Sequence, residues 1–222
     1  MIKIIINCVI FCYDHGTLKV LLSNEGNGAN TQWGILTGVL QNNQSADQAA
    51  VRLAQNYGVE KYILLRQLRA FIDPVQPGSG RNVTIGYYGL INIDEYKTMF
   101  GINGHYTRWW KVGDVQQLLP NHNKILDLSF HQIGNALRNS EVGFHLLPKE
   151  FRLSEIENLY KDILGSEANE SNFLKKVIQK GVIVPLNKQR EITIETEKLY
   201  KFNARGYEKL VMNNIFPFFN YL

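Results

Sequence analysis

One window of the sequence is basic without containing any acid. Its basic residues, between Ser171 and Arg190, are Lys175, Lys176, Lys180, Lys188 and Arg190, whereas the whole 222-residue chain has a formal net charge of only +4. Lysine and arginine side chains neutralise DNA phosphates, and an amide such as that of Asn172 can pair with the edge of adenine. A run of lysines is also typical of a solvated helix face, so the neighbouring elements decide between the two interpretations.

These neighbouring elements have the order of a helix-turn-helix. Apolar residues recur at helical spacing from Leu153 to Leu164, and Gly165 is expected to end that helix. A second helix is predicted from Ser171 to Lys180, with Phe173 on its apolar side and therefore in the core. The remaining expected elements are a short helix at Leu147–Phe151 and two strands able to form a wing, at Val182–Pro185 and Leu199–Phe202.

This order favours DNA binding. In helix-turn-helix proteins the start of the second helix faces base edges, while lysine and arginine side chains contact phosphates. We therefore assign DNA contacts on the second helix to Ser171, Asn172, Lys175, Lys176 and Lys180, and in the wing to Lys188 and Arg190.

The composition is that of an ordinary globular protein, with 45% hydrophobic and 20% charged residues. Cys8 and Cys12 lie on one predicted strand, about 13 Å apart at a rise of about 3.3 Å per residue, too far for a disulfide. Two unpaired buried thiols suit a reducing compartment. Asp14 ends the apolar N-terminal run well short of the ~20 residues of a membrane span, so we expect a cytoplasmic protein that does not enter a membrane.

Residues that could carry catalysis or bind a metal do not fall into a known spacing. The five histidines show no zinc-binding pattern, and Ser79 in Gly-Ser-Gly lacks the strand-turn-helix context of a nucleophile. No catalytic residue, metal site or cofactor is predicted.

The first two thirds of the chain are predicted to mix strands with helices. Asp14-His15-Gly16 is expected to turn a hairpin, and Ser45 is expected to cap a helix that Gly58 ends. The strands are expected at Ile4–Tyr13, Leu18–Leu22, Tyr62–Ile72, Asn82–Ile93 and Thr107–Val112, and the helices at Ala46–Tyr57 and Lys124–Leu137. Because the pattern changes near Asn139, two domains are expected, at residues 1–140 and 141–222.

The segment Trp33–Val59 resembles a Nudix box, whose pattern is G-x5-E-x7-R-E-U-x-E-E-x-G-U with U aliphatic. The matching residues are Gly38, the Ala49-Ala50-Val51-Arg52 run and Gly58-Val59. Nudix hydrolases hold Mg²⁺ on the acids of this helix, since a hard cation needs anionic oxygens. The positions of these acids are occupied here by Gln44, Leu53, Gln55 and Asn56. The helix keeps one acid, Asp47, which is expected to face solvent, so metal-dependent hydrolysis is not expected.

Two further stretches are similar to the NrtR-like family of Nudix-related transcriptional regulators. They are Arg66–Ile91, which includes G-R-N-V-T-I-G-Y-Y-G-L-I, and Gly143–Gly165, G-F-H-L-L-P-K-E-F-R-L-S-E-I-E-N-L-Y-K-D-I-L-G, followed by S-N-F-L-K-K. The resemblance implies an α+β protein, a Nudix-like α/β/α sandwich with a mixed sheet followed by a winged helix-turn-helix. It also implies an effector, ADP-ribose or, in one branch, arabinose. Family resemblance and two-fold operator symmetry together predict a homodimer on double-stranded DNA.

The leading hypothesis is therefore a DNA-binding regulator whose inactive Nudix domain senses a sugar or a sugar-nucleotide. Effector contacts are assigned to Trp33, Asp73, Arg81 and Tyr87, and a neutral sugar is favoured because little in the box would neutralise phosphates. The alternative is a metal-dependent Nudix pyrophosphatase with displaced catalytic residues. A third possibility is a protein-interaction adaptor that binds neither DNA nor a small molecule.

Overall fold

A computed structural model describes the backbone of residues 2–25, 32–62, 64–72, 82–93, 96, 106–165, 170–192 and 195–212. Side chains are described for the same residues except 25, 139, 170–172, 187–192 and 195–197. The chain divides into two compact units, Met1–Asp14 with Leu18–His131 and His15–Thr17 with Gln132–Leu222. The predicted domain boundary at residue 140 stays a prediction.

A long hairpin forms the centre of the first unit. β1 (Lys3–Asp14) is followed by β2 (Thr17–Glu25), which confirms the predicted hairpin. His15 and Gly16 join them with φ angles of +48° and +74°. Positive φ at both turn residues matches the twist of the two strands, which explains why a glycine follows the histidine.

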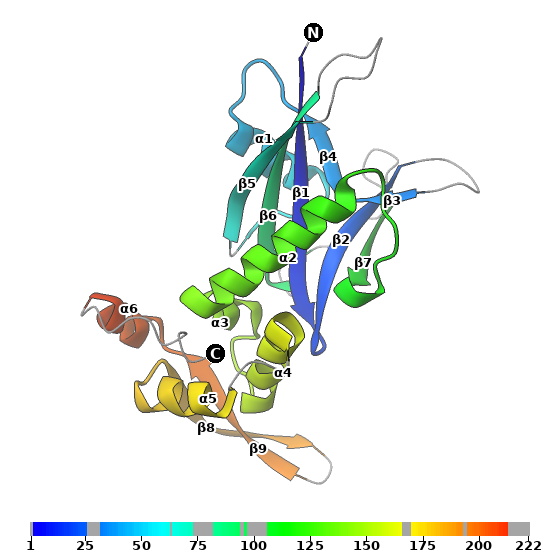
Figure 1. Ribbon diagram of the computed structural model, residues 1–222. Helices are drawn as coiled ribbons and strands as arrows, with labels where there is room; N and C mark the ends of the chain where they lie inside the picture. The colour runs from blue at the N-terminus through cyan, green and yellow to red at the C-terminus, as the bar shows by residue number, and fades with distance from the viewer. Residues whose placement is uncertain are drawn as a thin grey trace. The chain divides into compact units, whose positions relative to one another are not determined.

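The described residues of this unit build one seven-stranded mixed sheet (Figure 1). Its central path runs β3 (Gln32–Gly34), β2, β1, β6 (Asn82–Ile91) and β5 (Leu64–Ile72). β1 and β6 are parallel, whereas β4 (Leu36–Val39) pairs antiparallel with β1 and β7 (Tyr106–Lys111) antiparallel with β2. A short 3-10 helix, Val112–Asp114, follows β7.

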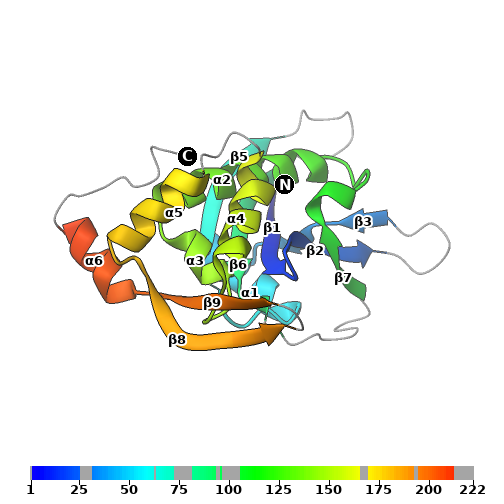
Figure 2. The same cartoon turned by 90° about the horizontal axis from the view of Figure 1, so that it is seen from below.

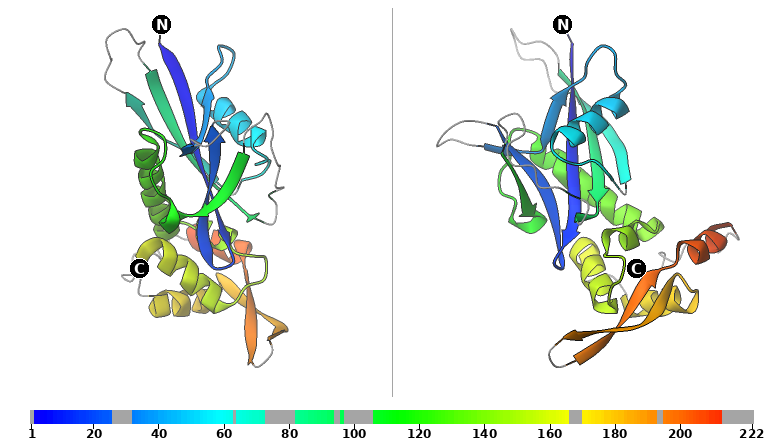
Figure 3. Two further views of the ribbon diagram at one scale, coloured as in Figure 1. Left: turned by 90° about the vertical axis from the view of Figure 1, so that its right-hand side faces the viewer. Right: turned by 180° about the vertical axis from the view of Figure 1, so that it is seen from behind.

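Helices cover both faces of this sheet (Figure 3). α1 (Ala46–Asn56) begins at Ser45, whose hydroxyl accepts the Gln48 backbone N–H at 3.1 Å while Gln48 Oε1 accepts that of Ser45 at 2.9 Å. The alanines and Leu53 of α1 pack on alternate residues of β1, such as Ile6. On the other face α2 (His122–Asn139) places Ile125 beside Gly86, where an added Cβ would lie 3.5 Å away. The expected α/β/α sandwich with a mixed sheet is therefore confirmed.

The second unit combines helices with a two-stranded sheet, and Figure 2 shows it from below. Its elements are α3 (Val142–Leu146), α4 (Leu153–Leu164), α5 (Glu170–Gln179), β8 (Ile183–Ile192), β9 (Glu195–Phe202) and α6 (Ala204–Met212). Gly165 ends α4 with a φ of +76°, as predicted. Both strands are longer than predicted, because their cross-strand pairing extends to Ile192 and Glu195.

The prediction of a short helix at Leu147–Phe151 is wrong. The short helix is α3, and Phe151 instead forms an antiparallel bridge with Tyr200 of β9. The Phe151 N–H and carbonyl make the two backbone hydrogen bonds of this bridge, at 2.9 and 2.8 Å, so the N–H is not available for a bond within a helix. Across the described residues, no helix has the length and apolar character needed to cross a membrane.

Candidate functional site

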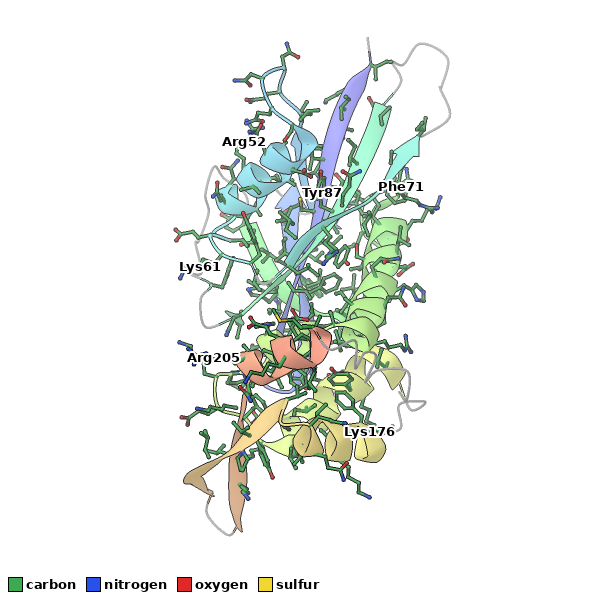
Figure 4. All side chains as sticks on the ribbon, turned by 90° about the vertical axis from the view of Figure 1, so that its left-hand side faces the viewer. Arg52, Lys61, Phe71, Tyr87, Lys176 and Arg205 are labelled. Atoms are coloured by element: carbon green, nitrogen blue, oxygen red, sulfur yellow. The ribbon has the colours of Figure 1, made fainter. Side chains whose placement is uncertain are left out.

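The two faces of α5 differ in character. Phe173, Leu174 and Val177 are at most 5% exposed, and the Phe173 ring lies 4.7 Å from that of Tyr160 on α4 and stacks at 6.4 Å on Phe144. The assignment of Phe173 to the core is confirmed. Of the predicted phosphate contacts, Lys175 and Lys180 are exposed and Lys176, labelled in Figure 4, is half-buried. The helix therefore presents lysines on a side that its packing leaves accessible.

The end of α5 is anchored to the last strand by Asn203, a residue that sequence reasoning missed. The Asn203 side-chain amide donates to the Gly181 carbonyl at 2.9 Å, and its backbone N–H donates to the Val182 carbonyl at 2.8 Å. Its Oδ1 also accepts the Gly206 N–H at 3.2 Å at the start of α6. Asn203 therefore holds α6 and the end of β9 against the turn that follows α5. An asparagine before an amphipathic run is a helix-cap signal that could have identified it.

The hairpin of β8 and β9 has the form of a wing. Lys188 and Arg190 lie in β8, and Arg190 is paired with Glu197 in the backbone register. Exposed lysines that sequence reasoning missed, Lys198 and Lys201, lie on β9. Ser171 and Asn172 lie in the first turn of α5, but their side chains, like those of Lys188 and Arg190, lie outside the described residues.

The structure does not bring Trp33 and Tyr87, the described members of the predicted effector set, to the same cavity. Trp33 packs edge-to-face on Trp110, with ring centroids 5.5 Å apart, and lines a cavity of about 280 Å³ near β7. Tyr87 is 2% exposed and packs in the core cluster beneath α1. Asp73 and Arg81 lie outside the described residues.

Asp47 is exposed, as expected, and it also accepts a hydrogen bond that the sequence did not predict. The Tyr87 hydroxyl donates to Asp47 Oδ1 at 2.6 Å and lies 3.2 Å from Gln67 Oε1. Burial, and then this hydrogen bond to Asp47, raise the pKa of Tyr87 far above its usual value. The acid of α1 therefore has a structural partner.

The box positions that carry acidic metal ligands in a Nudix enzyme are occupied here by a buried leucine and by exposed amides. Leu53 is 6% exposed and lies 3.1 Å from where a Cβ on Gly38 would stand, while Gln55 and Asn56 are exposed. Among the described residues, no three His, Cys, Asp or Glu side chains lie close enough together to hold a metal ion. A divalent cation prefers carboxylate oxygens, which these positions lack.

A cavity of about 510 Å³ lies between the sheet and the start of α2, and sequence reasoning did not predict it. Asn7, from the otherwise apolar β1, lines it and is only 3% exposed, and its Oδ1 has no hydrogen-bond partner in the described part of the chain. Arg69 and Lys124 supply positive charge to the lining, and the Arg69 guanidinium lies 5.2 Å from the ring centroid of Phe71, which is labelled in Figure 4. A buried amide inside an apolar strand is the sequence signal that could have found this site.

His122, at the start of α2, also lines this cavity. Its Nδ1 accepts the Ile35 backbone N–H at 3.2 Å, and burial lowers the pKa of His122. The imidazole is therefore neutral at pH 7, and Nε2 carries the proton. The cavity thus combines an acceptor on Asn7, a neutral imidazole and two cations, a set that suits a polar ligand with an anionic part.

Comparison with known proteins finds a family that part of the second unit matches. Residues 143–202 match the NrtR DNA-binding winged helix domain family. The chain is 24% identical over 209 residues to the ADPR responsive transcriptional repressor NtrR of Acinetobacter baylyi, a match that covers 91% of this chain and 83% of that protein.

Solved structures extend the likeness to the whole fold. Shewanella oneidensis NrtR complexed with a 27mer DNA is 20% identical, covers 92% of this chain and 95% of its own, and gives a TM-score of 0.73. A MutT/nudix family protein from Enterococcus faecalis is also 20% identical. The match covers 91% of this chain and 88% of that protein, with a TM-score of 0.66. The chain therefore has the fold of a Nudix-like mixed α/β domain followed by a winged helix domain that is similar to that of NrtR, as the sequence had led us to expect.

Proposed function

We propose that this protein is an NrtR-like transcriptional regulator that binds operator DNA through α5 and the β8–β9 wing. The observation that carries the proposal is the match of residues 143–202 to a DNA-binding winged helix domain. The exposed Lys175 and Lys180, on a helix whose opposite side is buried, support it.

The DNA contacts divide by chemistry. Ser171 and Asn172, in the first turn of α5, read base edges, whereas Lys175, Lys176 and Lys180 contact phosphates. Lys188 and Arg190 act from the wing, and Lys198 and Lys201 of β9 add to them. A homodimer brings two such surfaces to a palindromic operator.

The effector is a sugar or sugar-nucleotide bound in the 510 Å³ cavity, and ADP-ribose is the first candidate. The A. baylyi relative is ADPR responsive, and Arg69 and Lys124 offer the positive charge that phosphates need. This pair of cations shifts our preference from a neutral sugar toward a phosphate-bearing ligand. Effector contacts by Trp33, Asp73, Arg81 and Tyr87, and the arabinose-responsive branch, stay predictions.

We further propose that this protein binds its effector without hydrolysing it. Neutral amides and a leucine stand where the box would need carboxylates, and a sensor must hold its ligand without consuming it. The alternative, a pyrophosphatase with displaced residues, predicts release of AMP from ADP-ribose, or turnover of NADH, with Mg²⁺ or Mn²⁺. Turnover at ordinary enzyme rates of about 1 s⁻¹ or more would decide for the alternative.

The regulator proposal is tested by fluorescence anisotropy on an operator selected from random DNA with the full-length protein. We expect sequence-specific binding that ADP-ribose changes by about tenfold, a coupling of about 1.4 kcal/mol. Asn7→Ser and Lys124→Gln should reduce this response while leaving DNA binding in the absence of effector unchanged. Lys61→Gln, which removes the same charge from an exposed position outside the cavity, should respond like the parent. Absence of any specific DNA binding would contradict the proposal.

A further inference from the structure

A groove of about 420 Å³ in the second unit lies beside α6, between this helix and the start of α3. α6 itself lies beyond residues 143–202, which match the winged helix family, and Figure 2 shows it beyond the end of β9. Phe202, Tyr207, Val211 and Met212 line the groove, and Val211 and Met212 are 43% and 81% exposed. Exposed apolar side chains that adjoin a groove are typical of an interaction surface.

The exposed charges of α6 lie next to this apolar surface. Arg205, which is labelled in Figure 4, Glu208 and Lys209 are all exposed, and none of them forms an ion pair with another described residue. The other acid of the groove, Glu141, accepts a hydrogen bond from Tyr207, and burial followed by this hydrogen bond raises the pKa of Tyr207. Glu208 is therefore an acid at the groove whose charge the described residues leave unbalanced, and a base follows it directly.

A second copy of this chain has the chemistry to cover this surface. Two helices related by a two-fold axis that passes between them run antiparallel, and a residue on one side of the axis meets one from the other side in the partner. An axis at Glu208 and Lys209 places the acid of each copy opposite the base of the other. The same axis brings the exposed Met212 of each copy beside the alkyl stem of Arg205 in the other, which removes apolar surface from water.

We propose that α6 and the groove beside it contact α6 of a second copy of this chain and so join the two DNA-binding units. This inference rests on the proposed function, because it names an interface of the homodimer. Asn203 ties the start of α6 to the Gly181 carbonyl, and Gly206 packs so closely on this oxygen that an added Cβ would lie 2.9 Å from it. The turn that ends α5 is therefore coupled to α6. A contact between two α6 helices sets the distance between the two α5 helices, and hence the spacing of the operator half-sites.

The first test is cross-linking of the full-length protein in solution with a short bifunctional maleimide. Glu208→Cys introduces an exposed thiol near the proposed axis. The native thiols of Cys8 and Cys12 are buried, and burial raises the pKa of Cys8 to about 12, so they should not react. We expect a cross-linked dimer from Glu208→Cys and little from the control Lys161→Cys, at an exposed position on α4.

Adding Met212→Asp to Glu208→Cys should lower the yield of cross-linked dimer about tenfold, because the contact would bury a charge without a partner. Met212 is 81% exposed in the single chain, so this substitution should leave the fold unchanged.

The second test exchanges the two charges and measures dimerisation by sedimentation equilibrium at low salt. Glu208→Lys alone and Lys209→Glu alone each place like charges across the axis and should weaken dimerisation about tenfold. The double variant restores an acid opposite a base in both pairs and should recover the affinity of the parent. A merely local role of either residue in α6 would not produce this recovery.

Four results would overturn the proposal. They are a single-chain mass for the parent with and without operator, cross-linking of Glu208→Cys no stronger than that of Lys161→Cys, cross-linking that Met212→Asp leaves intact, and a double variant that dimerises no better than the single ones. Cross-linking that appears only after deletion of residues 215–222, which lie outside the described residues, would assign the groove to that segment and would also overturn it. Operator binding by the parent together with any of these results would refute the α6 contact alone, whereas absence of operator binding by the parent would refute the regulator.

Discussion

Replacing Lys175 by Ala should weaken DNA binding for every sequence and make the remaining affinity less sensitive to salt. Lys175 is exposed on α5, on the side away from the buried Phe173 and Val177. Alanine is the best helix former, so the substitution removes the ammonium without destabilising the helix.

The magnitude follows from counterion release. One lysine–phosphate contact contributes about 0.9 to the slope of log affinity against log salt concentration. The slope of log affinity against log salt concentration should therefore become shallower by about 0.9 for each bound subunit, and by about 1.8 for a homodimer. Between 50 and 200 mM salt, the ratio of parent to variant affinity should fall about 3.5-fold for one bound subunit and about 12-fold for two.

The assay is anisotropy on operator and on random DNA at four or more salt concentrations, for the parent and the variant. Lys61→Ala, which removes a lysine from an exposed position in the first unit, is the matched control for net charge. Equal slopes for the parent and Lys175→Ala, with both proteins folded, would show that this face of α5 does not lie on the DNA backbone. An effect on operator but not on random DNA would contradict the assignment of Lys175 to phosphate.

Three further predictions concern specificity, assembly and pH. Asn172→Ala should cost about 1–3 kcal/mol on the operator and little on random DNA, because an amide pairs with adenine, and equal losses on both would argue against base readout. Light scattering should give twice the 25.5 kDa chain mass at micromolar concentration, whereas a single-chain mass with and without DNA would count against the dimer. The free energy of unfolding should fall as pH drops below about 6.5, because the unfolded state then binds a proton that buried His122 resists. In urea titrations, the difference in the free energy of unfolding between pH 7.5 and pH 5.5 should be smaller for His122→Asn than for the parent. An unchanged difference would exclude His122 as its source.

Helix ends and strands were predictable from the sequence wherever a single residue or the spacing of apolar residues was enough to specify them. Ser45 and Gly165 mark helix ends through their own side chain or backbone, and the nearly continuous apolar run of β1 reflects burial on both faces of the sheet. The helix at 147–151 was mispredicted, since Phe151 takes its hydrogen bonds from Tyr200, 49 residues later. The residues around Phe151 in the sequence give no sign of this distant partner.

The sequence by itself determined the family resemblance, the missing box acids and the basic face of α5, because each depends on residue types at fixed spacing. Only the tertiary structure decided what surrounds those residues. Tyr87 and Asp47, forty residues apart, meet at 2.6 Å, a hydrogen bond that the sequence did not predict for either residue. The cavity of Asn7, Arg69 and Lys124 likewise assembles from β1, β5 and α2. A cavity is created by the packing of segments distant in sequence, and its charge depends on which of their side chains point inward.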